Sequence, residues 1–215
     1  MKITRIAKLK KGNRYAIYLD STYSFSVQQD TLIKEHLYSG QELDEGQIAE
    51  IKEKDNFQYL FEKSLGQLAR RPRSVSEIKR YLTNIITKYN SDSNLGVIAL
   101  VIKQLEAKNY INDEEFAQWF INNRKDFKQR SKNELRKELS LKGIHKDIIE
   151  RRLADQVSEA EELKNIAELI AKKSLYFKMR SSDTKQFREK ISSYLLRKGY
   201  SWDLIKQALA GFKQS

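Results

Sequence analysis

The feature that most constrains this chain is an internal repeat beyond residue 57. Residues 130–154 align with residues 186–210 at an offset of 56 positions. The identical pairs are Leu139 and Leu195, Lys142 and Lys198, Gly143 and Gly199, Asp147 and Asp203, Ile149 and Ile205, Leu153 and Leu209, and Ala154 and Ala210. A third segment matches the first of these at an offset of 57 positions. Its residues Arg73, Ser74, Glu77 and Leu82 correspond to Arg130, Ser131, Glu134 and Leu139. Such self-similarity is typical of repeat architectures, so we predict three related units of roughly 55 residues.

Helix-breaking residues are rare, with one proline and eight glycines among 215 residues, so helices must dominate. Capping-box spacing, Ser-x-x-Glu, occurs at the start of a helical pattern in two repeats, at Ser74–Glu77 and Ser131–Glu134. A Lys-Gly pair suits a helix end, because glycine adopts the left-handed conformation and lysine complements the helix dipole. We therefore expect three helices in each repeat and positive φ at Gly143 and Gly199. In the first repeat, the longer segment Asn90–Gly96 replaces this hinge.

The first 28 residues follow a different pattern, in which apolar and polar residues alternate over short runs separated by turn signals. Alternation of this kind predicts strands, so we expect a small antiparallel meander. Residues 30–54 predict two short helices, separated near Gly40, with the second beginning near Asp44. The first repeat should then open with a separate helix that carries Phe57.

These signals together predict a mainly α protein, with three tandem three-helix repeats and a small N-terminal antiparallel β meander. The expected boundaries are 1–55 for the meander and short helices, then 56–110, 111–156 and 157–215 for the repeats. We expect nine helices over residues 57–212.

Composition limits the chemistry. There is no cysteine, which excludes thiolate nucleophiles, disulfides and thiolate metal sites. His36 and His145 are isolated, and no glycine-rich phosphate loop occurs. We therefore expect no enzyme activity, no cofactor and no metal. No apolar stretch approaches the roughly 20 residues of a membrane span, so we expect a cytoplasmic protein without a membrane partner.

The charge balance points to the class of partner. Lys and Arg number 41 against 29 Asp and Glu, a formal net charge of +12, which favours nucleic acid, an anionic membrane or an acidic protein surface. Of these, nucleic acid or a nucleoprotein is the partner that we expect. The cations gather near matching places in the repeats: Arg70, Arg71 and Arg73; then Arg124, Lys125, Lys128, Arg130 and Lys132; then Lys172, Lys173, Lys178 and Arg180. Stacked repeats would align these clusters along one edge as a binding face. In the alternative interpretation, each cluster is a solvated turn.

Three motifs resemble those of the RecX family, whose members regulate the RecA recombinase. They are Leu68-Ala-Arg-Arg-Pro-Arg-Ser74-x-x-Glu77-Ile78, then Leu105-x-x-x-x-Tyr110-Ile-Asn-Asp113-x-x-Phe116-Ala117, and the hinge Lys142-Gly143-Ile144. The resemblance covers about residues 57–210, and the leading strands with Gly40-Gln-Glu-Leu-Asp-Glu45 are similar to longer members. Two departures are Asn109, where glycine usually precedes the tyrosine, and the missing Arg-Ser box in the third repeat.

The resemblance implies a non-enzymatic protein that binds RecA filaments, lies along their helical groove or blocks their growth, and so suppresses strand exchange and the accompanying ATPase. We expect a monomer, with single- or double-stranded DNA as a further candidate partner. It transfers no agreed set of binding residues. We expect charge reversal of Lys128, Arg130 and Lys132 to abolish inhibition and leave the fold intact. Two alternatives stay open, a helical array that binds DNA or RNA directly and a protein scaffold whose charge serves solubility. Binding to naked strands and to RecA-coated strands would separate them.

Overall fold

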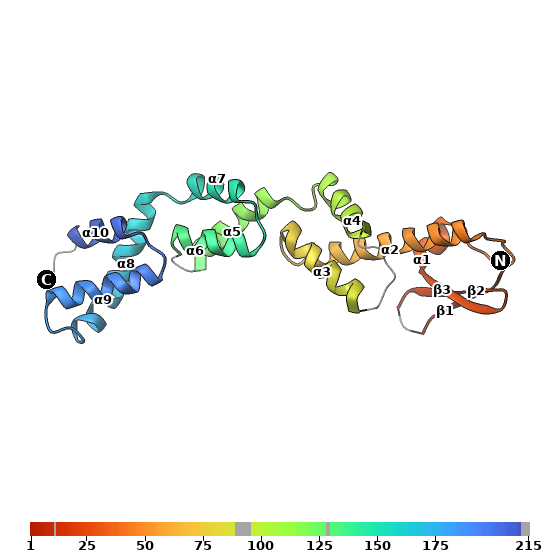
Figure 1. The fold of residues 1–215 in the computed structure, drawn as a ribbon, viewed down its shortest axis with the longest axis horizontal. Coiled ribbons are helices and arrows are strands. Elements are labelled where there is room, and N and C mark those ends of the chain that lie inside the picture. Colours follow the sequence, from red (N-terminus) through yellow and green to blue (C-terminus); the bar gives the residue numbers. More distant parts are fainter. Residues whose placement is uncertain (11, 89–95, 128–129, 212–215) are drawn as a thin grey trace. The chain divides into compact units, whose positions relative to one another are not determined.

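The computed structural model describes residues 1–10, 12–88, 96–127 and 130–211, without the side chains of residues 125–127. Its contacts divide the chain into two compact units, Met1–Ile111 and Asn112–Ser215, here called the N-terminal and C-terminal units. The described residues form ten helices and one three-stranded sheet (Figure 1). The predicted fold class, mainly α with a small N-terminal sheet, is confirmed.

The sheet is the meander that the alternating pattern predicts. Its antiparallel strands lie in the order β1-β2-β3, with bounds β1 Ile3–Lys8, β2 Arg14–Leu19 and β3 Thr22–Gln28. The turn between β2 and β3 holds Asp20 at φ 47° and Ser21 at φ 70°, the geometry that suits a tight hairpin. The helices α1 (Gln29–Lys34) and α2 (Glu45–Leu68) cover one face of the sheet (Figure 1). Between sheet and helices lies a core that includes Ile17, Val27 and Ile51.

The expected break before Phe57 is wrong, because α2 runs without interruption over 24 residues. Asp44 caps its start, accepting a hydrogen bond from the Gln47 backbone N–H. Asp55, in mid-helix, is buried and accepts hydrogen bonds of 2.7 Å from the Arg14 guanidinium and from the Gln28 backbone N–H. On the surface, an aspartate at this position would favour a helix end. Here Asp55 is buried and bonded to the sheet, and α2 continues through it into the first repeat.

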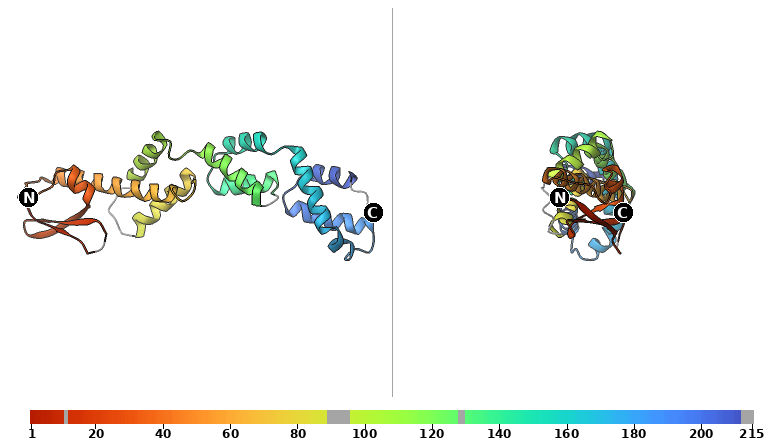
Figure 2. Two further views of the ribbon diagram at one scale, coloured as in Figure 1. Left: turned by 180° about the vertical axis from the view of Figure 1, so that it is seen from behind. Right: turned by 90° about the vertical axis from the view of Figure 1, so that its right-hand side faces the viewer.

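Nine helices, counting α2, fall into the three predicted sets of three (Figure 2). The first set is α2, α3 (Val75–Lys88) and α4 (Gly96–Ala107); the second is α5 (Asp113–Phe127), α6 (Lys132–Leu141) and α7 (Lys146–Gln156); the third is α8 (Glu159–Lys178), α9 (Thr184–Arg197) and α10 (Trp202–Gly211). Each set has its own apolar core. The equivalent residues Leu82, Leu139 and Leu195 are fully buried in these cores, as the repeat alignment requires.

The serine caps and the glycine stops that the sequence predicts are confirmed. The side chains of Ser74 and Ser131 each accept a hydrogen bond of 3.1 Å from the backbone N–H three residues on. Gly143 and Gly199 have φ of 77° and 80°. The third repeat, which lacks the Arg-Ser box, uses Asp183, whose side chain accepts a bond of 2.8 Å from the N–H of Gln186. Most of the predicted loop Asn90–Gly96 lies outside the described residues, and Gly96 opens α4.

Candidate partner-binding surface

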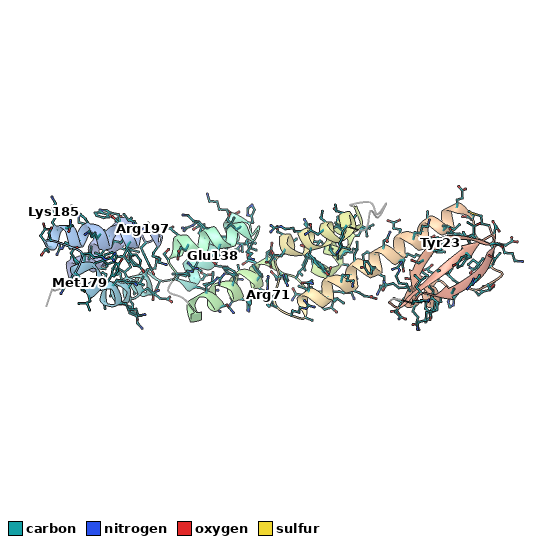
Figure 3. The ribbon with its side chains drawn as sticks, turned by 90° about the horizontal axis from the view of Figure 1, so that it is seen from below. Tyr23, Arg71, Glu138, Met179, Lys185 and Arg197 are labelled. Atoms are coloured by element: carbon teal, nitrogen blue, oxygen red, sulfur yellow. The ribbon has the colours of Figure 1, made fainter. Side chains whose placement is uncertain are left out.

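The first basic cluster lies between α2 and α3 and is largely engaged within the protein. Both terminal nitrogens of Arg71 donate to the Glu77 carboxylate at 2.9 Å, and Figure 3 labels this arginine. Arg73 donates to the Gln67 side-chain oxygen at 2.9 Å. Arg70 is exposed. Two of the three arginines therefore hold the turn in place.

The second cluster surrounds the turn between α5 and α6, where carboxylates also lie close to the cations. Arg124 donates to Glu138 at 2.7 Å and lies over the Phe120 ring at 4.9 Å. Arg130 lies 3.0 Å from Glu134 and 3.4 Å from Glu138. Lys128 and the side chain of Lys125 lie outside the described residues. The charges of the two described arginines, Arg124 and Arg130, are therefore balanced within the protein.

The same turn joins the second repeat to the third within the C-terminal unit. The Ser131 hydroxyl donates to the Lys198 carbonyl at 2.8 Å, and the Asn133 amide donates to the Gly199 carbonyl at 2.9 Å. The Glu162 carboxylate, which is buried, accepts from the Lys132 backbone N–H at 2.9 Å, and the Lys132 ammonium donates to the Val157 carbonyl at 3.5 Å. The positive end of α6 thus meets the negative end of α9, a favourable dipole arrangement.

The surroundings of this joint shift the pKa values of two side chains, Tyr200 and Glu150. Burial, together with the nearby carboxylates of Glu162 and Glu134, raises the pKa of the Tyr200 hydroxyl. On the neighbouring surface, the Arg136 guanidinium donates to Glu150 and holds the pKa of that carboxyl below its usual range. The hydroxyl of Tyr200 therefore stays protonated well above the pH at which exposed tyrosines ionise.

The third cluster differs from the other two, because it combines cations with exposed apolar side chains. It lies on the last two turns of α8 and just beyond them, and Figure 3 labels Met179 there. Leu175 is 70% exposed and Met179 is 80% exposed. Arg180 and Lys173 lie over the Tyr176 ring at 4.3 Å and 5.9 Å. We call Lys172, Lys173, Leu175, Tyr176, Met179 and Arg180 the α8 patch.

The cations of the α8 patch have fewer carboxylate partners than those of the first two clusters. Among the contacts described, Lys172 has a loose contact of 3.9 Å with Glu168, on an exposed surface. Exposed pairs of this kind contribute little. Lys178, at the end of the helix, has a further interaction of its own. Exposed apolar side chains next to cations are suited to a partner that offers both apolar and acidic groups.

The two clusters of the C-terminal unit lie at opposite ends of α8. Lys132 contacts Glu162 in the first turn of that helix, whereas Lys178 is its last residue. The sixteen residues between Glu162 and Lys178 correspond to about 24 Å along a helix. The third cluster also lies mainly within the helix and not in the turn after it. The two clusters are therefore too far apart to form one continuous binding surface. A binding role for either of them stays a prediction.

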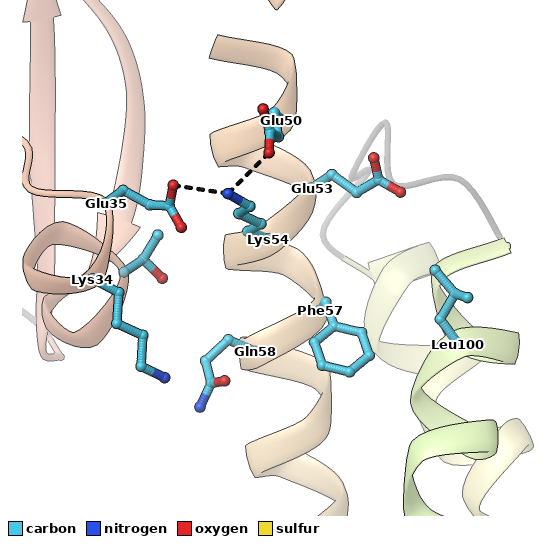
Figure 4. Close-up of a pocket in the computed structure, with 9 residues that line it drawn as sticks. Lys34, Glu35, Glu50, Glu53, Lys54, Phe57, Gln58 and Leu100 are labelled. Carbon is cyan, nitrogen blue, oxygen red and sulfur yellow. Dashed lines mark hydrogen bonds and ion pairs between the residues drawn. The ribbon is translucent and has the colours of Figure 1, made fainter. Parts of the chain in front are cut away.

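A cavity of about 440 Å³ lies beside α1, α2 and α4 in the N-terminal unit (Figure 4). The Lys54 ammonium crosses its wall and lies 2.9 Å from both Glu35 and Glu50; these carboxylates raise the pKa of Lys54. Phe57 and the half-exposed Leu100 form the apolar side. Lys54, Glu35 and Glu50 therefore satisfy one another in this wall of the cavity.

The described residues also bear on metal binding and on membrane insertion. In that part of the chain, His, Asp and Glu side chains nowhere gather in threes as a metal site would need. None of its helices is both long and apolar enough to cross a bilayer.

Sequence reasoning found the cations and missed the groups that neutralise them. Glu134 and Glu138 follow Arg130 at spacings of four and eight, which place them on the same side of a helix. That spacing was a usable signal for internal pairing. The exposure of Leu175 and Met179 had no comparable signal, since apolar residues at helical spacing are usually buried.

Comparison with known proteins identifies matching families along most of the chain. Family models match as the regulatory protein RecX N-terminal domain at residues 1–44, as the RecX second three-helix domain at residues 112–153, and as the RecX third three-helix domain at residues 160–209.

Individual relatives agree with the family models. The regulatory protein RecX of Bacillus pumilus (strain SAFR-032) is 33% identical over 96% of this chain and 76% of its own length. That of Bacillus subtilis (strain 168) is 34% identical over 96% and 75%. A crystal structure of regulatory protein RecX, 27% identical, superposes with a TM-score of 0.73 over 97% of this chain and 98% of that one. RecX from Lactobacillus salivarius, 21% identical with a TM-score of 0.66 over 73% and 96%, shares the fold.

Proposed function

The chain belongs to the RecX family of regulatory proteins, and on this premise we propose that it binds RecA filaments on DNA and inhibits their recombinase and ATPase activity. The regulator is non-enzymatic and acts through binding alone. It works in the cytoplasm, because a filament on chromosomal DNA is its target. Family membership supports a link to RecA, while inhibition and filament binding are the parts that need a test.

The α8 patch is the observation that carries this proposal. Arg71, Arg124 and Arg130 are bonded to carboxylates of the helix that follows each of them, so a partner would have to break those pairs. Lys173 and Arg180 lie over an aromatic ring instead, where their charge remains available. A nucleoprotein filament presents anionic DNA and acidic protein surface, which match this patch. Of the cations that the sequence singled out, Lys172, Lys173 and Arg180 are therefore our first candidates.

The test is a titration of RecA ATPase on single-stranded DNA with the wild-type protein and with the triple charge reversal Lys172→Glu, Lys173→Glu and Arg180→Glu. We expect the half-inhibitory concentration to rise about tenfold or more, with a weaker dependence on salt, because the reversed charges oppose the filament. The variant should keep its circular dichroism spectrum, since surface substitutions usually change stability little. The matched control reverses three exposed cations in the N-terminal unit, namely Lys79, Arg80 and Lys103.

The two results that contradict the proposal differ in meaning. A folded α8 variant that inhibits as strongly as the wild type removes this surface from the proposal. A wild-type protein that leaves RecA unaffected removes the proposed function itself. Equal losses in the α8 variant and in the control would show that net charge alone matters.

Charge reversal of Lys128, Arg130 and Lys132 is a poor test of this function. Arg130 contacts both Glu134 and Glu138, so a glutamate in its place would bring three carboxylates together. Like charges at such spacing destabilise a helix. Arg130→Glu should therefore destabilise the start of α6, so that a loss of inhibition in this variant could come from unfolding.

Direct binding to DNA or RNA is the second candidate function. Comparing binding to naked single strands with binding to RecA-coated strands separates the two. Preference for coated strands favours the regulator, and equal affinity for naked strands favours the nucleic-acid-binding array.

A further inference from the structure

The N-terminal sheet has one face that α1 and α2 leave uncovered. Both helices pack on the opposite face, around Ile17, Phe25 and Val27 (Figure 1). Figure 3, seen from below, labels Tyr23 on this sheet. The uncovered face is not part of the cores that account for the fold, so its side chains need a separate explanation.

A row of three large side chains crosses this face from strand to strand. Arg5 pairs with Tyr18, and Tyr18 pairs with Tyr23, in the register of the sheet. The Arg5 guanidinium lies 5.3 Å from the centre of the Tyr18 ring. The Tyr18 and Tyr23 rings meet edge to face, 6.0 Å apart. The row is therefore held together by one cation–π contact and one aromatic pair.

A register shift in β3 brings Tyr23 to this face. Ile17 pairs with Phe25, but the next residue, Tyr18, pairs with Tyr23, so one extra residue, Ser24, is inserted. Without it, Tyr23 and Phe25 would point the same way, since alternate residues share a face. Phe25 is 5% exposed in the core, whereas Tyr23 is 56% exposed. The bulge thus presents an aromatic ring to solvent that regular pairing would have turned inward.

Beside this row the face is made of small residues. Ala7 pairs with Ala16, and Ala16 pairs with Ser26, across the three strands. None of these side chains can rise as far from the sheet as a tyrosine ring. Ala16 is 1% exposed, and the Arg14 guanidinium donates to the Ser26 hydroxyl at 3.2 Å, so this part of the face is already covered. The exposed part of the face is the row itself, where a planar group can lie against Tyr23.

The charge of the strands and turns is strongly positive. Residues 1–28 contain six Lys or Arg and one acidic residue, Asp20. Arg14 is bonded to the buried Asp55, and Asp20 accepts from the Lys2 backbone N–H. Within residues 1–28, the exposed cations that the structure describes are Lys2, Arg5, Lys8 and Lys10. Of these, Arg5 belongs to the row, whereas Lys8 pairs with Tyr15 and so points to the opposite face. Cations around a flat aromatic surface attract a polyanion that carries planar groups.

We propose that this face binds single-stranded DNA, with a base stacked on Tyr23 and a phosphate near Arg5. Unpaired bases expose their ring faces, whereas a duplex hides them in its stack, so an exposed tyrosine on a flat sheet matches a single strand. An acidic protein would use the cations and leave the tyrosine row unexplained. The choice of DNA over RNA rests on the proposed function. The proposal that this face stacks an unpaired base is independent of that function.

The test uses the full chain without RecA. Binding of fluorescein-labelled thirty-nucleotide oligo-dT is followed by fluorescence anisotropy at low salt, with a duplex of equal length and oligo-rU as further arms. Tyr23→Ala should weaken binding to oligo-dT about tenfold, because one base–aromatic stack is lost, and Arg5→Ala should weaken it as well. Tyr23→Phe should bind like the wild type, since the ring is kept. Tyr38→Ala is the matched control, because Tyr38 is 62% exposed in the same unit but lies outside the sheet.

Three outcomes would overturn the inference. They are equal affinity of Tyr23→Ala and wild type for oligo-dT, an equal loss on the duplex, and binding of oligo-rU in the absence of oligo-dT binding. A loss confined to single strands, with Tyr23→Phe and Tyr38→Ala unchanged, supports it. RecA ATPase inhibition by the wild type is measured separately, so failure of this inference and failure of the proposed function are distinct results.

Discussion

Replacing Gly199 with alanine tests how the second and third repeats are joined. Gly199 has φ of +80°, and a Cβ placed on it would lie 2.6 Å from the Ser131 hydroxyl oxygen and 3.4 Å from the Glu134 backbone nitrogen. That hydroxyl caps α6 and donates to the Lys198 carbonyl. The methyl group therefore meets both an unfavourable backbone conformation and the side chain that holds the joint.

The expected magnitude follows from these contacts. The left-handed conformation costs a non-glycine residue about 1 kcal/mol. Displacement of Ser131 removes an N-cap, worth about 1 kcal/mol, and one further hydrogen bond, also about 1 kcal/mol. Gly199→Ala should therefore lower the free energy of unfolding by about 3 kcal/mol, of which about 2 kcal/mol belongs to Ser131.

A double-mutant cycle separates the two parts. Ser131→Ala alone should lower the free energy of unfolding by about 2 kcal/mol. The double variant should then lose about 3 kcal/mol in total, because only backbone strain is left for alanine at position 199 to add. The measurement is urea unfolding followed by tryptophan fluorescence. Both tryptophans, Trp119 and Trp202, lie in the C-terminal unit, so the signal reports the unit that holds the joint.

Two results would refute this reasoning. Strict additivity in the cycle would mean that Gly199 and Ser131 do not interact. A loss for Gly199→Ala of about 1 kcal/mol, the backbone strain alone, would mean that the close approach to Ser131 is relieved at no cost.

Three further predictions concern stability. Gly143→Val should cost about 1 kcal/mol or more, because φ is 77° there; an unchanged melting temperature would contradict this. The folded pKa of Tyr200 is raised above the ordinary 10.0, so its stabilisation is complete below pH 10 and is lost as the pH rises further. Tyr200→Phe should flatten the fall of stability in alkali, and an identical pH profile would count against burial as the cause. Asp55→Ala should cost about 3 kcal/mol, since it leaves a partly buried guanidinium without its carboxylate; thermal unfolding followed by circular dichroism measures it.

The helices and their ends could be predicted because their signals are local. A capping serine and its glutamate lie three positions apart, and a Lys-Gly stop needs only two adjacent residues. Asp183 and Gln186 use the same spacing in the third repeat, with aspartate in the place of the serine. The uninterrupted α2 could not be predicted in this way, because the bond that buries Asp55 comes from β2, far away in sequence.

The candidate site was harder to predict, because a charge count does not say which cations are already paired. Arg124 and its partner Glu138 are 14 positions apart and belong to different helices. Their pairing depends on how α5 and α6 pack, which no local pattern contains. The aromatic row on the sheet likewise depends on a bulge that shifts the register by one residue.

The repeats themselves indicate where a partner should bind. The residues that recur, such as Ser131 and Gly199, serve caps and joints, so similarity between repeats marks the scaffold. Departures from the repeat then mark surfaces with another purpose. α8 has 20 residues against 15 in α5, and its extra turns carry the exposed Leu175 and Met179. The sheet has no counterpart in the repeats and carries the exposed Tyr23. The exposed side chains of both surfaces therefore lie outside the caps and joints that hold the repeats. Charge reversal of these side chains, or their replacement by alanine, should change binding without unfolding the protein.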